Sequence, residues 1–112
     1  MLDPTPNLQP EADLLKTFLH PLLEDFQYWF SRSRSLLEAY RIDFLDTQQQ
    51  SDLLNRVKQA QQEVSAAQSL FQATDYQAGV DTSMMMPWHH LVTECWQVGM
   101  RFRQENLKIG GE

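Results

Sequence analysis

The sequence has few of the residues that cross-link a chain or break it into short elements. It contains one cysteine and four glycines among 112 residues, and three of its five prolines lie within the first ten positions. A single cysteine excludes an intramolecular disulfide, as is usual in a reducing compartment. With so few turn-forming residues after residue 10, we expect few secondary-structure elements, each of them long.

Signals for export, membrane insertion and polyanion binding are also missing. No stretch of about 18 uncharged apolar residues occurs, so no transmembrane helix is expected. The first residues, MLDPTPNLQPEAD, are acidic and proline-rich, which does not fit a secretory signal, and we expect a cytoplasmic protein. The net charge of −6 argues against general binding to nucleic acid or to an anionic membrane.

The apolar residues that are present follow the spacing of helices. An apolar content of 42% in 112 residues is enough for one domain with one core. We expect a flexible arm over residues 1–9, a single helical domain over residues 10–106 and a flexible tail over residues 107–112. Three long helices with short connections favour an all-α, antiparallel up-down-up three-helix bundle.

The first helix is expected from about Pro10 to Tyr40. Its apolar residues are alternately four and three positions apart, with one polar interruption at Ser33. Pro21 lies inside this pattern and costs about 3 kcal/mol in an unbroken helix. We therefore expect a kink at Pro21, or two coaxial pieces of which the second begins there. The predicted seam contains Leu15, Leu19, Leu22, Phe26, Trp29, Ser33, Leu36 and Tyr40, widened by Leu14, Phe18, Leu23, Phe30 and Leu37.

The second helix is expected to end near Ala73. Asp46 or Thr47 can cap its start, and Gln49 or Gln50 can complete a capping box. Its outer face is rich in glutamine, which we interpret as a solvated face rather than a polar interface. The predicted seam contains Leu53, Val57, Ala60, Val64, Ala67 and Phe71.

The third helix is expected to end near Asn106. Thr82 or Ser83 can cap its start, and Pro87 then lies in the first turn, where its missing N–H is no loss. The predicted seam contains Trp88, Val92, Cys95, Gly99 and Phe102.

The segment SMMMPWHHLVTECW, residues 83–96, combines residue types that bind metals or pigments. His90 and Glu94 share a helical face, and His20 would lie at a similar height in an up-down-up bundle. Cys95 falls on the predicted seam, where a free cysteine normally acts as a small apolar residue. A structural zinc site needs four ligands of suitable spacing, so we predict no cofactor. The alternative is a metal or tetrapyrrole carrier that uses His20, His90, Glu94 and Cys95.

Motifs of catalysis are absent. The sequence contains no Gly-rich phosphate loop, no G-x-S-x-G and no H-E-x-x-H. Adjacent acids such as Glu24 and Asp25 are typical of helix ends and solvated surfaces. No nucleophile, base and stabilising group can be placed together, so we expect a protein that is not an enzyme.

The predicted topology brings the end of the first helix, the start of the second and the end of the third to one pole. Every lysine and arginine except Lys16 falls in this half, and most of the acids fall in the other. A dipolar molecule of this kind is steered toward a charged partner, so we predict that the pole binds an acidic protein surface. The predicted partner-binding cations are Arg32, Arg34, Arg41, Arg56, Lys58, Arg101 and Arg103.

The segment FQYWFSRSR, residues 26–34, places aromatic residues beside these arginines. Its four aromatic side chains cover much of the helix circumference, so they cannot all face one core. Tyr28 and Trp29 complete the predicted binding surface. Self-association and a foreign protein partner would both cover such residues.

Three segments, PLLEDFQYWFSRSRSLLE, DLLNRVKQAQQEVSAAQSLFQAT and MPWHHLVTECWQVGMRFR, account for most of residues 12–104. Together they resemble a small cyanobacterial family labelled as a domain of unknown function, DUF2605. The resemblance implies a cyanobacterial, cytoplasmic protein of about this length, and it adds no activity, cofactor or catalytic residue. The prediction is therefore a non-enzymatic helical interaction module that serves as an adaptor, assembly or regulatory factor.

Overall fold

The computed structural model describes residues 15–75 and 82–110 of the chain, and the predicted arm over residues 1–9 lies outside them. Within the described residues the chain is helical apart from turns, and no strand occurs. The helices in chain order are η1, a π-helical segment (Leu15–Leu19), α2 (His20–Ala39), α3 (Thr47–Ala73) and α4 (Thr82–Gly110).

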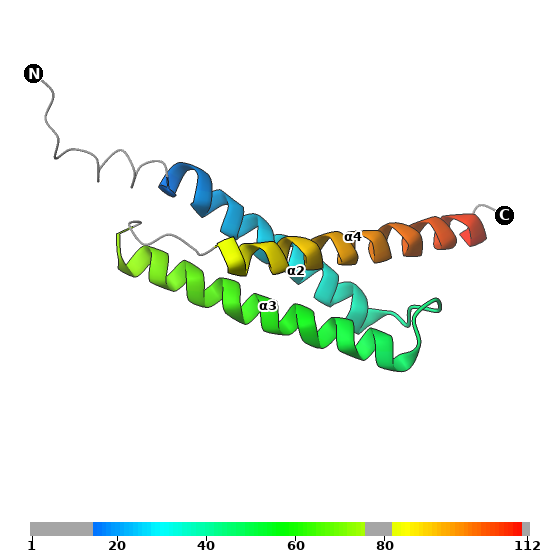
Figure 1. Cartoon of the computed structure of the whole chain (residues 1–112). Helices are drawn as coiled ribbons and strands as arrows, with labels where there is room; N and C mark the ends of the chain where they lie inside the picture. Colours follow the sequence, from blue (N-terminus) through cyan, green and yellow to red (C-terminus); the bar gives the residue numbers. More distant parts are fainter. Residues whose placement is uncertain (1–14, 76–81, 111–112) are drawn as a thin grey trace, which may run out of the picture.

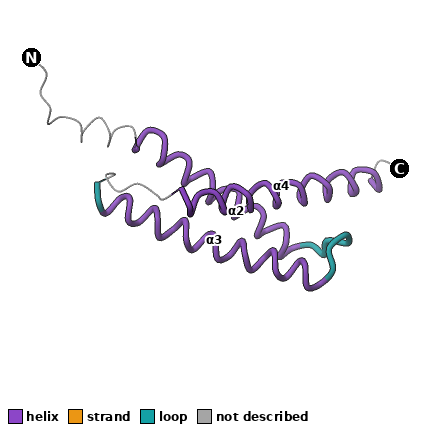
Figure 2. The backbone as a smooth tube through the Cα atoms, in the orientation of Figure 1, coloured by secondary structure: helices purple, strands orange, loops and turns teal. Residues whose placement is uncertain are grey.

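The helices form an up-down-up bundle. α3 runs back along α2, and α4 runs in the same general direction as α2 (Figures 1 and 2). α2 contacts both of the other long helices, whereas α4 moves away from α3 toward its C-terminal end. The predicted all-α three-helix bundle is confirmed, with α2 as its central element. None of the helices in residues 15–75 and 82–110 combines the length and apolarity that a membrane crossing needs.

The helix type changes directly before Pro21. The π-helical turns of η1 end at Leu19, and α2 begins at His20 with Pro21 in its first turn. The N–H groups of a first helical turn have no partner within an α-helix, so a proline there removes little. The interruption predicted at Pro21 therefore takes the form of a change from π-helix to α-helix.

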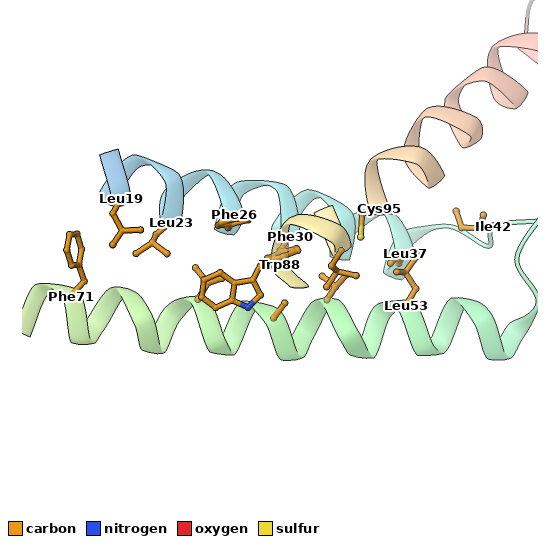
Figure 3. Close-up of a cluster of buried hydrophobic side chains, with 14 residues drawn as sticks. Leu19, Leu23, Phe26, Phe30, Leu37, Ile42, Leu53, Phe71, Trp88 and Cys95 are labelled. Carbon is orange, nitrogen blue, oxygen red and sulfur yellow. The ribbon is translucent and has the colours of Figure 1, made fainter. Parts of the chain in front are cut away.

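The buried stripe of α2 differs from the predicted seam. Leu22, Trp29 and Tyr40 belong to that seam but are exposed. Leu22 and Trp29 each precede another large apolar residue, so the sequence offers two overlapping stripes one residue apart. The second member of each pair faces the core, and the predicted seam is wrong at these positions. The core residues of η1 and α2 are Leu19, Leu23, Phe26, Phe30 and Leu37 (Figure 3).

Side chains from the start of α3 close the turn between α2 and α3. The capping box predicted at Asp46 is confirmed, because Asp46 Oδ1 accepts from the Gln49 N–H at 2.7 Å and Gln49 Oε1 accepts from the Asp46 N–H at 2.9 Å. Gln50 Nε2 donates to the carbonyls of Leu37 and Tyr40 at 2.9 and 2.8 Å. The last carbonyls of a helix lack donors within the helix, so Gln50 caps α2 from the neighbouring element.

The glutamine-rich face of α3 partly faces α2. Gln27 of α2 donates to Ser65 Oγ at 2.7 Å and to the Gln61 carbonyl at 3.2 Å. Arg34 donates to Gln61 Oε1 at 3.2 Å. The interpretation of this face as wholly solvated is therefore wrong, because part of it forms a polar border along the α2–α3 interface. The buried residues of α3 are Leu53, Val57, Ala60, Val64 and Phe71, all in the predicted seam.

α4 differs from the prediction at both ends. Thr82 and Ser83 are helical residues rather than caps, and the helix continues to Gly110, past the end expected near Asn106. Pro87 is therefore inside the helix and not in its first turn. At this position proline lacks the N–H of one regular backbone hydrogen bond, so the start of α4 depends on tertiary packing.

Trp88 supplies that packing. Its side chain is 1% exposed, and its ring lies edge-on to Phe26 of α2, with 5.6 Å between the ring centroids. Its indole N–H donates to Glu63 Oε1 of α3 at 2.9 Å. Leu91 and Cys95 continue the buried stripe. α4 is thus anchored near its start, and the part beyond Cys95 lies away from α3 (Figure 3).

Candidate functional site

A cleft with a volume of about 260 Å³ lies between α2 and α4. On α2 the cleft borders the face of the exposed Trp29, which is not part of the buried stripe. On α4 it borders the face beside the core residue Cys95. Each wall presents side chains three or four positions apart, as one face of a helix does. The lining residues are Trp29, Arg32, Ser33 and Leu36 from α2 and Val92, Cys95, Trp96, Gly99 and Arg103 from α4.

Two tryptophans line this cleft, one from each helix. Trp29 is 39% exposed and Trp96 is 51% exposed. A β-carbon at Gly99 would lie 4.0 Å from Leu36 Cδ2, an ordinary van der Waals contact, so α4 passes close to Leu36 at this position. Half-exposed aromatic rings are typical of protein interfaces, because they add a large apolar area with few rotatable bonds.

A cluster of aromatic and cationic groups forms the α2 edge of the cleft. Arg32 Nη1 donates to Tyr28 Oη at 3.0 Å, and the Arg32 guanidinium carbon lies 5.8 Å from the centre of the Tyr28 ring. Tyr28 packs edge-on against Trp29 with 5.1 Å between the ring centroids. These contacts position Arg32 without neutralising its charge.

The charge of the cleft is positive. Arg32 and Arg103 line it, and no carboxylate does so among the residues that the structure describes. Within the same part of the chain, Arg103 forms no hydrogen bond or ion pair. Two arginines beside apolar walls, in a chain of net charge −6, form a local site suited to carboxylates.

The pole predicted from the topology does form. Tyr40 at the end of α2 packs against Phe102 of α4, with 5.3 Å between the ring centroids. The Arg101 guanidinium lies 4.1 Å from the centre of the Phe44 ring in the turn between α2 and α3. The end of α2 and the turn that leads into α3 therefore contact α4 near Phe102 at one end of the bundle.

Most of the predicted basic residues at this end are already engaged. Arg41 donates to the Ile42 carbonyl and to Gln50 Oε1, both at 2.7 Å. Arg56 makes two hydrogen bonds to the Glu94 carboxylate, at 2.9 and 2.8 Å, which raise the pKa of Arg56. The remaining ion pairs are Arg34–Glu38 at 3.4 Å, Lys58–Glu38 at 3.8 Å and Arg101–Glu105 at 3.1 Å.

The four residues of the carrier alternative are not brought together. His20 lies 3.6 Å from a carboxylate of its own helix, and Glu94 binds Arg56. His90 is exposed beside a hollow of about 520 Å³ between α3 and α4, whereas Cys95 borders the α2–α4 cleft. In residues 15–75 and 82–110 no group of three or more His, Cys, Asp or Glu side chains could hold a metal ion.

The positions of His20 and His90 along the bundle axis explain why these two histidines lie apart. Because Trp88 packs against Phe26, the start of α4 lies beside the middle of α2 and not beside its start. His20 precedes Phe26 by six residues, or about 9 Å along the helix axis, whereas His90 lies beyond Trp88 in the other direction. The expectation that His20 and His90 lie at similar positions along the bundle axis is therefore wrong.

Cys95 is a buried thiol. Burial raises its pKa above the ordinary value, and a hydrogen bond with Ser33 partly opposes this effect. A protonated thiol is a poor nucleophile and a poor metal ligand. Cys95 therefore has the apolar role predicted for it.

The α4 wall of the cleft was not predicted as a binding surface. Val92, Trp96, Gly99 and Arg103 are four, three and four positions apart, so they form a second helical stripe beside the core stripe. The predicted seam assigned Val92 and Gly99 to the core, and both are only half-buried. Arg103 was predicted as a partner-binding residue, and it lies beside Trp96, a residue outside every predicted site.

The sequence profile of a family described as "Protein of unknown function (DUF2605)" matches residues 9–104 of the chain. The chain belongs to this DUF2605 family. The DUF2605 match contains every residue that lines the cleft, from Trp29 to Arg103. No curated protein and no solved structure matches the chain.

Proposed function

We propose that this DUF2605 protein is a non-enzymatic protein-interaction module that binds an acidic segment of a partner protein in the α2–α4 cleft. The observation that carries the proposal is that Trp29, Trp96, Arg32 and Arg103 line one cleft that has no carboxylate among its described lining residues. A module of this kind would serve as an adaptor, assembly or regulatory factor.

The chemistry of binding follows from the two kinds of side chain. An apolar side chain of the partner would be buried between Trp29 and Trp96, since aromatic residues and arginine supply most of the binding energy at protein interfaces. Carboxylates on either side of it would pair with Arg32 and Arg103 through two parallel hydrogen bonds each. Apolar walls reduce the water around these pairs, which makes each pair stronger than a fully exposed one.

The size of the cleft favours a protein side chain over a small ligand. Its volume of about 260 Å³ is below the roughly 300–1,000 Å³ of small-molecule sites. The burial of Cys95 in the apolar core and the separation of His20 from His90 support a non-enzymatic role without a bound metal.

The remaining predicted partner-binding cations lie outside the cleft lining. Carboxylates or carbonyls already engage Arg34, Arg41, Arg56, Lys58 and Arg101. We propose that Arg41, Arg56 and Arg101 act through long-range attraction, whereas the pairing of Arg34 and Lys58 with Glu38 leaves these two outside the binding surface. On the net charge of −6 and the family resemblance, we also propose a cytoplasmic, cyanobacterial protein that does not bind nucleic acid.

Affinity capture with matched charge variants tests the proposal. Arg32→Gln/Arg103→Gln removes two positive charges from the cleft, and Arg34→Gln/Lys58→Gln removes two from the α2–α3 surface, so both double variants have the same net charge. Immobilised wild-type protein and the second variant should retain the same proteins from a lysate of the source cells, and the first variant should lose them. A retained protein should then bind the purified wild-type chain directly, with an affinity that falls as salt rises. Equal retention by both variants would refute the cleft as the docking site.

A further inference from the structure

We infer that the segment bound in the α2–α4 cleft is an amphipathic helix with carboxylates on one border, lying between α2 and α4 as a fourth helix. This inference rests on the proposed function and specifies the conformation and charge pattern of the partner. It is based on the helical spacing of the side chains in the two walls, on the paired backbone groups of both helices and on the positions of Arg32 and Arg103.

Both walls are helical faces, and the α2 face extends beyond the cleft. Leu22, Trp29 and Leu36 are seven residues apart, and the exposed Leu22 continues the face of Trp29 and Leu36 outside the cleft lining. On α4, Val92, Trp96 and Gly99 repeat at spacings of four and three. Apolar side chains at these spacings interlock with the same spacings on a third helix, as in helix-in-groove recognition.

The backbone of the walls also selects a helix over an extended strand. The residues that line the cleft lie within α2 and α4, whose backbone donors and acceptors are used inside each helix. An extended segment would find no sheet edge to pair with and would bury its own N–H and C=O groups beside apolar walls, at a cost of about 1–3 kcal/mol for each unsatisfied group. A helix enters with these groups already paired.

The arginines set the spacing of the acidic residues on the partner. Ser33 bonds to Cys95, and Tyr40 packs against Phe102, so Arg103 lies near the level of Tyr40. Arg32 is eight residues before Tyr40, so the backbone positions of Arg32 and Arg103 are about 12 Å apart along the helix axis. Two carboxylates seven residues apart on a helix are separated by about 10.5 Å on one face, and they can reach both arginines.

The same charges argue against a second copy of this chain docked through the same face. A symmetric pair would bring Arg32 and Arg103 of one copy against the same two residues of the other. Like charges held together beside apolar walls are unfavourable, whereas an acidic partner neutralises them. The partner we infer is therefore a different protein that carries an acidic amphipathic helix.

Two peptide display libraries test the inference on the full chain. Both consist of peptides of about 21 residues with the same composition. One has apolar residues at heptad positions, glutamates seven residues apart and a proline in the first turn, and the other has a scrambled order with that proline at its centre. We expect binders almost entirely from the first library, at least tenfold weaker binding to the Arg32→Gln/Arg103→Gln protein, and less than twofold change with Arg34→Gln/Lys58→Gln. Selected peptides should gain helical circular dichroism on binding.

The outcomes separate this inference from the function on which it rests. Equal selection from both libraries, with binding still lost in the Arg32→Gln/Arg103→Gln protein, would overturn the helical partner and leave the acidic docking site in place. Affinities that do not change in that double variant would overturn both. A chain that dimerises at the concentrations used, with peptides unable to dissociate the dimer, would replace the acidic partner with a second copy.

Discussion

The two interfaces of α2 differ in how completely their polar groups are satisfied. Along α3, α2 has a continuous apolar stripe bordered by Gln27, Gln61 and Ser65, and Gln50 caps its last turn. Along α4, contact is concentrated at Trp88, Leu91 and Cys95, and beyond them lies a cleft with arginines that lack carboxylate partners among the described residues. The first interface has the features of a stable pairing, and the second has those of a surface that can accept a further protein.

The largest expected effect is the loss of the α4 anchor. Trp88→Ala should destabilise the protein by about 3–5 kcal/mol, because it opens a cavity and leaves Glu63 without its indole donor. Trp96→Ala, a matched control on the same helix, should cost less than about 1 kcal/mol because half of its side chain is exposed. Urea unfolding followed by circular dichroism measures both. Similar losses in the two variants would contradict the assignment of Trp88 to the core and Trp96 to the cleft.

The next effect concerns the cap on α2. Gln50→Ala removes the donor to the Leu37 and Tyr40 carbonyls and the acceptor of the Ile42 N–H at 2.9 Å. We expect a loss of about 1–2 kcal/mol, since each net hydrogen bond contributes roughly 0.5–1.5 kcal/mol and water replaces part of it. Gln62→Ala, at an exposed position of the same helix, is the control and should leave the unfolding midpoint unchanged. An equal effect at both positions would show that Gln50 has no special role.

A smaller effect is expected for the ion pair that joins α3 to α4. The Arg56 and Glu94 side chains are about half exposed, so solvent reduces the value of their two hydrogen bonds. A double-mutant cycle with Arg56→Gln and Glu94→Gln should give a coupling of about 0.5–1 kcal/mol that shrinks at high salt. A coupling of several kcal/mol would mean that the α3–α4 side is held as firmly as the α2–α3 side.

The local signals in the sequence predicted the fold well. The spacing of Leu53, Val57 and Val64 identified the buried face of α3, and Asp46 with Gln49 marked its start. Short connections then required neighbouring helices to run in opposite directions. These features depend on residues close together in the chain, which is why the sequence alone is sufficient for them.

The face of α2 that is buried, and the position of α4 along α2, could not be predicted in the same way. Trp29–Phe30 and Leu22–Leu23 are adjacent pairs of large apolar residues, so both faces satisfy the helical period and only packing against α3 selects one. The level of α4 depends on the contact between Trp88 and Phe26, which no local pattern encodes. For the same reason the residues of the cleft were predicted only in part, through Trp29, Arg32 and Arg103. The prediction that His20 and His90 lie at the same position along the bundle was wrong.

The smallest expected effect concerns Cys95, at the boundary between the two kinds of interface. Its folded pKa is raised by burial, so the folded state keeps the thiol proton to a higher pH than the unfolded chain does. The protonated thiol contributes fully to stability below the pKa of cysteine in the unfolded chain, about 8.5. This contribution declines as the pH rises from there through the pKa of Cys95 in the folded protein. Wild-type protein should therefore lose more unfolding free energy than Cys95→Ala does as the pH rises from about 8 to about 10.

Subtracting the pH profile of unfolding free energy for Cys95→Ala removes the contribution of lysines and tyrosines that titrate in the same pH range, because both proteins contain them. A constant offset between the two profiles is expected from the smaller side chain, and only the slope reports the thiol. Alkylation by iodoacetamide gives an independent measure, since the buried thiol should react much more slowly than the same thiol in urea. Parallel profiles together with fast alkylation would mean that water reaches Cys95 from the cleft, and that the α2–α4 side is open down to the core.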